Sequence, residues 1–211
     1  MRKRPFTLVE LLVVIVIMMI LVAAVVPVYS RIMTGSAVGH AARMVSSQLN
    51  LARTEACARR KTVAVIFANN AMNYDATNAP ILDRRAFRSC YLKDNTMEFE
   101  AWVPGTKWEV VPTGATISVE QGSGTITVPT AAETDFKEDF FTGGAGLTTA
   151  IVFYPTGKPV LPAGATTRRQ VRVTEGVLTT NGGDIVKANA DNHIDCYVNS
   201  FTGAIVSKQA E

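Results

Sequence analysis

Few side chains of this sequence have the types and the spacing that catalysis requires. The two histidines, His40 and His193, lie far apart in the chain, and neither belongs to a His-Glu-x-x-His zinc pattern. No Gly-x-Ser-x-Gly nucleophile turn occurs, and the cysteines form no Cys-x-x-Cys pair. The run 143–146 (GGAG) follows no clear strand and opens no clear helix, which argues against a phosphate-binding loop. We therefore expect neither an enzyme nor a bound cofactor.

Oxygen ligands gather in one region near the end of the chain, at Asp184, Asp191, Asn192 and Asp195. Carboxylate and amide oxygens are the ligands that Ca²⁺ prefers. Their spacing is not that of an EF-hand loop, so a solvated polar loop is favoured over a metal site.

The three cysteines, Cys57, Cys90 and Cys196, are an odd number. In an oxidising compartment one disulfide can form and one thiol is left over. Alternatively, all three are small buried apolar residues. The sequence leaves both possibilities open.

Two arginine clusters are the best candidates for contacts with DNA phosphates: Arg84, Arg85, Arg88 and Arg168, Arg169, Arg172. The net charge of +3 comes from 21 Lys and Arg against 18 Asp and Glu. Arg2, Lys3 and Arg4 account for that whole excess, so residues 5–211 are formally neutral. A neutral body argues against DNA as a partner.

The elements that position these residues begin with one long apolar run. From Phe6 to Val28, 20 of 23 residues are apolar, which as a helix spans about 34 Å and suffices to cross a bilayer. The basic residues before it should stay cytoplasmic and leave the rest of the chain outside. A plain membrane anchor and a secretory signal cut near Ser30 are the alternatives, but the run is long for a signal and contains Glu10. The absence of other long apolar runs excludes a polytopic membrane protein, and the 47% hydrophobic content excludes a disordered chain.

An amphipathic pattern follows and predicts that the helix continues to about Arg60. Its apolar stripe is Val38, Ala42, Val45, Leu49, Ala52 and Ala56. Pro27 should kink this helix, or alternatively end its membrane half.

The remaining residues alternate in the manner of strands. We expect strands at 62–68, 90–92, 97–102, 116–119, 125–128, 150–154, 170–177, 194–198 and 204–207, with turns at 121–124 (a hairpin) and 199–203. The predicted fold class is α+β: a long N-terminal helix, transmembrane in its first half, packed on an antiparallel β-sheet body.

The sequence Phe6-Thr7-Leu8-Val9-Glu10 and the apolar run behind it resemble the N-terminus of type IV pilins and type II secretion pseudopilins. The resemblance implies that prepilin peptidase cuts between Pro5 and Phe6 and that Phe6 is N-methylated. Glu10 would then be the fifth mature residue and pair with the amine of an adjacent subunit, and Pro27 occupies a recurrent family position. The family prefers Gly before the cut, where this chain has Pro5.

Three body segments extend the resemblance to GspH/FimT-type minor pseudopilins and minor pilins. They are 49–56 (LNLARTEA), 151–157 (IVFYPTG) and 202–205 (TGAI). The implied organisation is a leader (1–5), a transmembrane or filament-core helix (6–29), an amphipathic helix half (30–60) and a periplasmic β-rich domain (61–211).

We therefore interpret the chain as a structural subunit of a type II secretion pseudopilus or a type IV pilus. Its implied partners are prepilin peptidase, other major and minor pilins or pseudopilins, an inner-membrane assembly platform, and membrane lipid before assembly. It would cross the bacterial inner membrane once and then enter the filament. The alternative is a membrane-anchored extracytoplasmic binding module, such as a DNA-uptake receptor.

Overall fold

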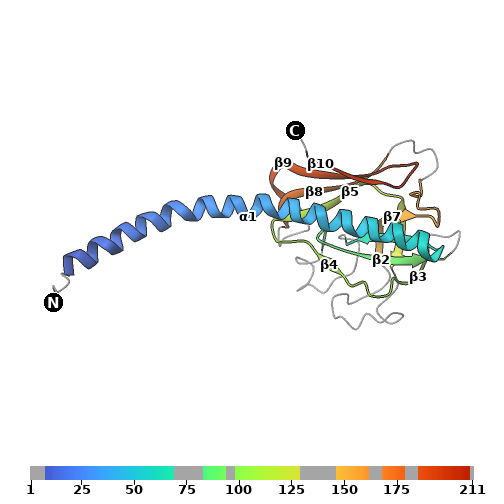
Figure 1. Ribbon diagram of the computed structural model, residues 1–211, viewed down its shortest axis with the longest axis horizontal. Helices are drawn as coiled ribbons and strands as arrows, with labels where there is room; N and C mark the ends of the chain where they lie inside the picture. The colour runs from blue at the N-terminus through green and yellow to red at the C-terminus, as the bar shows by residue number, and fades with distance from the viewer. Residues whose placement is uncertain are drawn as a thin grey trace.

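The computed structural model describes residues 8–68, 83–93, 98–128, 146–161, 168–178 and 185–209. For residues 24–35, 124–128, 146–148, 177–178 and 185–190 it describes the backbone alone. A long helix extends from a body of β-sheets (Figure 1).

Helix α1 (Leu8–Arg59) is 52 residues long, or about 78 Å. It ends close to the predicted residue because Arg60 adopts a positive φ of 55°, the left-handed conformation that commonly terminates helices. Pro27 lies within the helix, so the alternative that it ends the helix is wrong. The kink at Pro27 remains a prediction.

The body contains two sheets, in which every described strand pair is antiparallel. The first sheet has the order β3-β2-β1-β7-β6, with β4 also paired to β2. Its strands are β1 (Thr62–Phe67), β2 (Ala86–Leu92), β3 (Phe99–Trp102), β4 (Glu109–Val110), β6 (Gly124–Val128) and β7 (Gly146–Phe153). The second sheet has the order β10-β9-β8-β5, with β5 (Ala115–Gln121), β8 (Arg169–Leu178), β9 (Ile185–Val198) and β10 (Ile205–Gln209).

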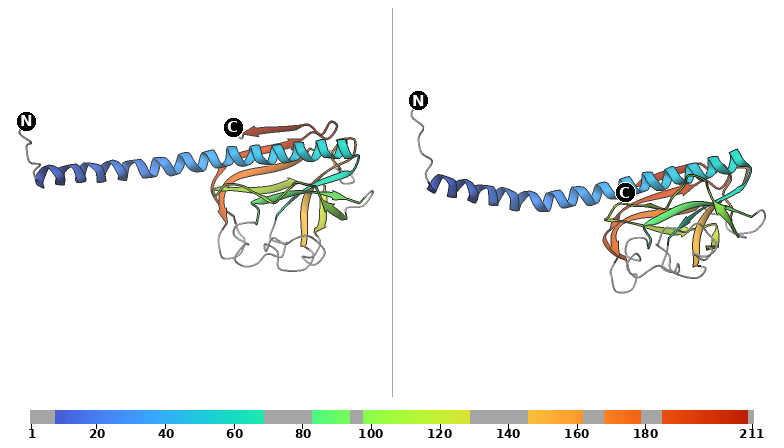
Figure 2. Two further views of the ribbon diagram at one scale, coloured as in Figure 1. Left: turned by 60° about the horizontal axis from the view of Figure 1, so that its bottom comes forward. Right: turned by 90° about the horizontal axis from the view of Figure 1, so that it is seen from below.

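The C-terminal part of α1 lies along both sheets (Figures 1 and 2). All six residues of the predicted apolar stripe are buried, with at most 3% of each exposed. They share one core cluster with Val65 and Ile151 of the first sheet and Val173 and Val198 of the second. The predicted α+β architecture is confirmed, and the helix is what joins the two sheets.

The opposite face of the first sheet is also covered. Strand β1 (TVAVIF) is buried at every position, which fits a sequence without polar alternation. Ala64 and Ile66 belong to a second apolar cluster, against which Trp102 and Trp108 pack. Both faces of β1 are therefore buried.

The predicted hairpin at 121–124 is wrong. Strand β5 pairs with β8 in one sheet, whereas β6 pairs with β7 in the other. The Ser123 N–H donates to the Ala150 carbonyl and its Oγ accepts from the Val152 N–H, both from buried positions. These bonds tie the connection to β7, and the glycine-rich segment carries the chain from one sheet to the other.

The other predicted strands are present, but the observed lengths of some differ from the predicted ones. Strand β2 is longer than predicted because its residues from Phe87 onwards pair with β1. The polar Ser89 within it is buried and accepts a hydrogen bond from Gln48 of α1 at 2.8 Å. The short strand β4 was not predicted, and β9 begins nine residues earlier than residue 194.

Candidate assembly site

The N-terminal half of α1 exposes a continuous apolar surface. Every side chain from Leu8 to Ala23 is exposed, and among the large apolar ones the exposed fraction ranges from 45% for Ile15 to 81% for Leu8. In the part of the chain that the structure describes, no helix is long and apolar enough to cross a membrane. Contiguous apolar surface of this extent marks a site that another molecule covers.

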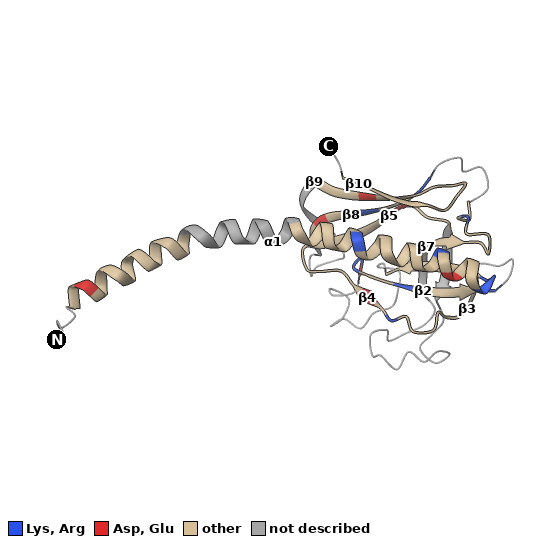
Figure 3. Ribbon diagram, viewed as in Figure 1, with Lys and Arg blue, Asp and Glu red and all other residues tan. Residues whose placement is uncertain are grey.

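Glu10 is the one charged residue of this segment (Figure 3). It lies in the first turn of α1, where the helix dipole favours a negative charge, and its side chain is exposed. Phe6, Pro5 and the leader residues Arg2, Lys3 and Arg4 lie outside the described residues. Cleavage, methylation and the pairing of Glu10 with an amine therefore remain predictions.

The three body segments that carry the family resemblance meet at the end of the body farthest from the N-terminus. Arg53 and Cys57 of α1, Gly157 after β7 and Gly203 before β10 form this junction, which we call the distal junction. A Cβ on Gly157 would lie 2.8 Å from Cys57 Sγ, and a Cβ on Gly203 would overlap the Gly157 carbonyl oxygen. Both glycines also have positive φ, of 76° and 69°.

Each glycine closes a tight turn that backbone hydrogen bonds hold. The Gly157 N–H donates to the Tyr154 carbonyl, and the Tyr154 N–H donates to the Lys158 carbonyl, both at 2.8 Å. The Gly203 N–H donates to the Asn199 carbonyl, also at 2.8 Å. The sequence identified these segments one by one, but their contact depends on the fold.

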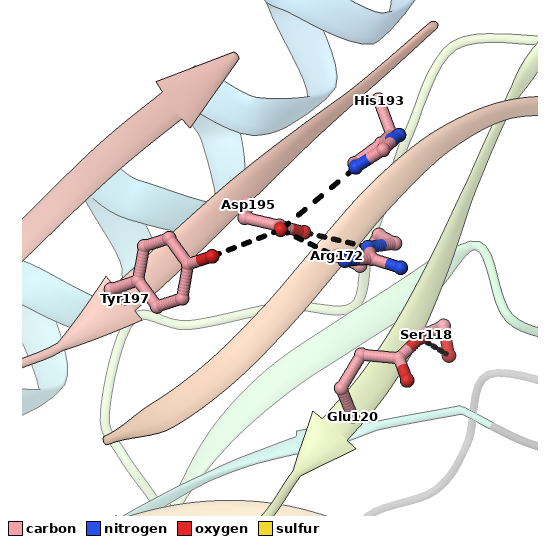
Figure 4. A network of polar contacts seen from close by, with 6 residues as sticks. All are labelled: Ser118, Glu120, Arg172, His193, Asp195 and Tyr197. Carbon is pink, nitrogen blue, oxygen red and sulfur yellow. Dashed lines mark hydrogen bonds and ion pairs between the residues drawn. The ribbon is translucent and has the colours of Figure 1, made fainter. Parts of the chain in front are cut away.

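The basic cluster around Arg172 is engaged within the protein (Figure 4). Arg172 Nε and Nη2 donate to the two Asp195 carboxylate oxygens at 2.7 and 2.9 Å. Arg169 is 97% buried and donates to the Gly122 carbonyl, while the Arg168 guanidinium lies 5.7 Å from the Tyr197 ring centroid. Two of the three arginines therefore already have protein partners that a phosphate would have to displace.

Asp195 is the centre of this network. Burial opposes its ionisation, but hydrogen bonds from Arg172 and Gln170, the Arg172 charge and the Tyr197 hydroxyl outweigh burial and lower the Asp195 pKa. His193 Nε2 lies 3.9 Å from the same carboxylate. The carboxylate thus serves the fold of the second sheet.

The second arginine cluster is also used internally. Arg85 donates to the Val111 carbonyl at 3.0 Å. Arg88 donates to the Thr106 carbonyl at 2.8 Å, and its guanidinium lies 4.3 Å from the Trp102 ring centroid. These arginines fix the loop between β3 and β5.

Two of the oxygen ligands predicted near the chain end, Asn192 and Asp195, are engaged by other side chains. Asn192 Nδ2 donates to Glu175 at 2.6 Å, and Asp195 is engaged by Arg172. Asp184 lies outside the described residues. Among the described residues, no group of three or more His, Cys, Asp or Glu side chains could hold a metal ion.

All three cysteines are free, so the disulfide left open by the sequence does not occur. Cys90 and Cys196 are buried, as the alternative expected, but Cys57 is exposed. Burial raises the pKa of Cys90 to about 12, with Arg88 a smaller opposing influence.

Two known family descriptions match the sequence of this chain. Residues 41–190 match the family described as type II transport protein GspH, and residues 1–26 match the prokaryotic N-terminal methylation motif. No curated protein matches the chain.

Two solved structures are similar in fold. The type IV minor pilin FimU of Pseudomonas aeruginosa shares 12% identity over 81% of this chain and 87% of its own, with a TM-score of 0.45. The minor pseudopilin EpsH of the Vibrio cholerae type 2 secretion system shares 11% identity over 82% and 96%, with a TM-score of 0.43. Because the family match covers more than half of its residues, the chain belongs to the type II transport protein GspH family, and it is a minor pseudopilin or minor pilin.

Proposed function

We propose that this chain is processed between Pro5 and Phe6, inserts once in the bacterial inner membrane, and then joins a filament through the N-terminal half of α1. One observation carries the proposal: sixteen consecutive exposed residues, Leu8–Ala23, contain a single charge and form one helix with the packed half. Members of this family are structural subunits rather than enzymes, are anchored in the membrane by this helix, and assemble with other pilins.

The same surface suits two successive environments. Lipid accepts an apolar helix because the backbone hydrogen bonds are satisfied within it. A bundle of similar helices in a filament would bury the same side chains against each other. Arg2, Lys3 and Arg4 would hold the N-terminus in the cytoplasm, which leaves the β-rich body in the periplasm. An inner-membrane assembly platform would then move the subunit from lipid to filament.

Glu10 would select the position at which a subunit enters the bundle. A carboxylate among apolar side chains is costly unless a positive group pairs with it. The methylated amine of Phe6 in a neighbouring subunit is the positive group that this family supplies. The pairing would thereby fix the axial register between two helices.

The first test is the mass of the mature N-terminus. We expect a chain that begins at a methylated Phe6. An intact Met1 would refute the processing step and favour the membrane-anchored binding module, whereas a new N-terminus near Arg31 would refute it in favour of a cleaved secretory signal. The measurement also reports whether the peptidase accepts Pro5.

The second test concerns Glu10. We expect Glu10→Gln, which keeps the shape and removes the charge, to insert in the membrane normally but to be lost from filaments sheared off the cells. Glu55→Gln, on the packed half of α1, is the control and should assemble. Normal incorporation of the Glu10 variant would contradict the proposed role.

A further inference from the structure

Two aromatic side chains are exposed beside the distal junction. Among the described residues outside the N-terminal half of α1, four large hydrophobic side chains are exposed: Leu51, Tyr154, Phe201 and Val206. Phe201 is 80% exposed and Tyr154 is 47% exposed. They lie on the two turns whose glycines are in contact, so the aromatic groups are concentrated at one end of the body.

The turn that carries Phe201 is held rigidly. Asn199 Oδ1 accepts hydrogen bonds from the N–H groups of Phe201 and Thr202 at 2.9 and 3.0 Å. Thr202 Oγ1 accepts one from the Ala204 N–H at 3.2 Å. The ring is thus presented to solvent by a fixed backbone, and little conformational entropy would be lost when a partner covers it.

The turn that carries Tyr154 cannot move independently. Gly203 lies directly against the Gly157 carbonyl and beside the Arg53 side chain, and Gly157 lies against the side chains of Arg53 and Cys57. The two aromatic residues are therefore presented by one rigid unit anchored to the end of α1. A rigid pair of exposed aromatic residues has the properties of an interface hot spot.

The orientation of the subunits indicates what covers this surface. In the proposed filament all subunits would have entered the membrane with the same polarity and their helices would pack in parallel, so neighbouring subunits would contact each other head to tail. The body packs on α1 from Ala37 onwards, while residues 8–36 project about 42 Å beyond it. The aromatic turns lie near the C-terminal end of α1, at the end of the body away from that projection (Figure 2). The next subunit away from the membrane would therefore present the membrane-proximal end of its body to the aromatic turns.

We propose that Phe201 and Tyr154 form a second assembly contact, with the membrane-proximal end of the body of the next pilin-like subunit toward the filament tip. Residues 199–205 (NSFTGAI) carry no charge, which suits a neutral apolar partner surface and not a nucleic acid. The inference rests on the proposed function, because it requires that the chain enters a filament. It adds a contact on the body to the contact made by the helix.

The test uses the full chain in cells that produce the filament. We expect the double variant Tyr154→Ser/Phe201→Ser to be processed and membrane-inserted normally, while its amount in sheared filaments falls about thirtyfold, as the loss of an interface hot spot implies. The matched control is Val206→Ser, which removes a side chain that is 52% exposed on β10. The control should stay within twofold of the native chain.

The outcomes separate this inference from the proposed function. Normal incorporation of the double variant, together with loss of the Glu10→Gln variant, would refute the body contact alone. If both variants assemble normally, both ideas fail. A photo-crosslinking amino acid at position 201 gives an independent readout: we expect an adduct with another subunit of the sheared filament. No adduct, or an adduct with a protein outside the filament, would overturn the proposal.

Discussion

Replacing Gly203 by alanine tests how the distal junction is built. Gly203 has a φ of 69°, which costs an L-residue about 1–2 kcal/mol. The added methyl group would also overlap the Gly157 carbonyl oxygen, and overpacking of this kind costs about 1–3 kcal/mol. We therefore expect Gly203→Ala to destabilise the body by about 3 kcal/mol, or a fall in Tm of about 6–12 °C for a chain of this size.

Gly105 provides a matched control. Its φ of 79° is similar, but nothing lies within 4 Å of a Cβ built on it. Gly105→Ala thus introduces the same backbone strain and the same reduction in the conformational entropy of the unfolded chain, but without the overlap. The difference between the two variants isolates the contact between the turns.

The assay is thermal unfolding of the full chain in detergent, followed by circular dichroism in the β-sheet region. We expect Gly203→Ala to unfold at a lower temperature than Gly105→Ala by an amount equivalent to about 1–3 kcal/mol. Equal unfolding temperatures would show that the turns can separate without cost. That result would refute the contact and also remove the rigid support proposed for Phe201 and Tyr154.

Two further predictions concern the body. Asp195→Asn should lower stability at pH 7 by about 2 kcal/mol, since it removes a charged partner from two hydrogen bonds of Arg172. Because folding lowers the Asp195 pKa, the stabilisation by the Asp195 carboxylate is fully present above its ordinary pKa of 3.8 and is lost as the pH falls through the lower pKa of the folded state. The native chain and the variant should therefore converge in acid unfolding curves, and a constant difference down to pH 2 would contradict this. In the folded chain we expect Cys57 to react with a thiol reagent, whereas Cys90 and Cys196 should react only after unfolding. Rapid reaction of all three thiols in the folded chain would show that the body is not packed as described.

The long helix and most strands follow from local patterns. The six-residue stripe between Val38 and Ala56 has the spacing of one helix face, and this face is what α1 buries. Strand β1 is apolar throughout, so its type could be recognised without knowledge of its neighbours. The apolar N-terminal run and Glu10 could likewise be recognised from residue type and order alone.

Pairing partners could not be predicted in the same way. Residues 121–124 have the composition of a hairpin turn, but their hydrogen bonds go to Ala150 and Val152, which follow much later in the chain. Similarly, whether Arg172 is available to a ligand depends on Asp195, on the adjacent strand. Both outcomes depend on contacts between distant segments.

The sequence by itself determined the apolar helix, the charge at its start and the order of the family segments, because these depend on residue type and local spacing. Only the tertiary structure decided that Arg53, Gly157 and Gly203 meet and that Phe201 stays in solvent. Local preferences act over a few residues, whereas the distal junction joins three segments through steric contacts that exist only when both sheets pack on α1. Family membership can therefore be recognised from the sequence, while the surface that the body exposes at the distal junction is a property of the fold.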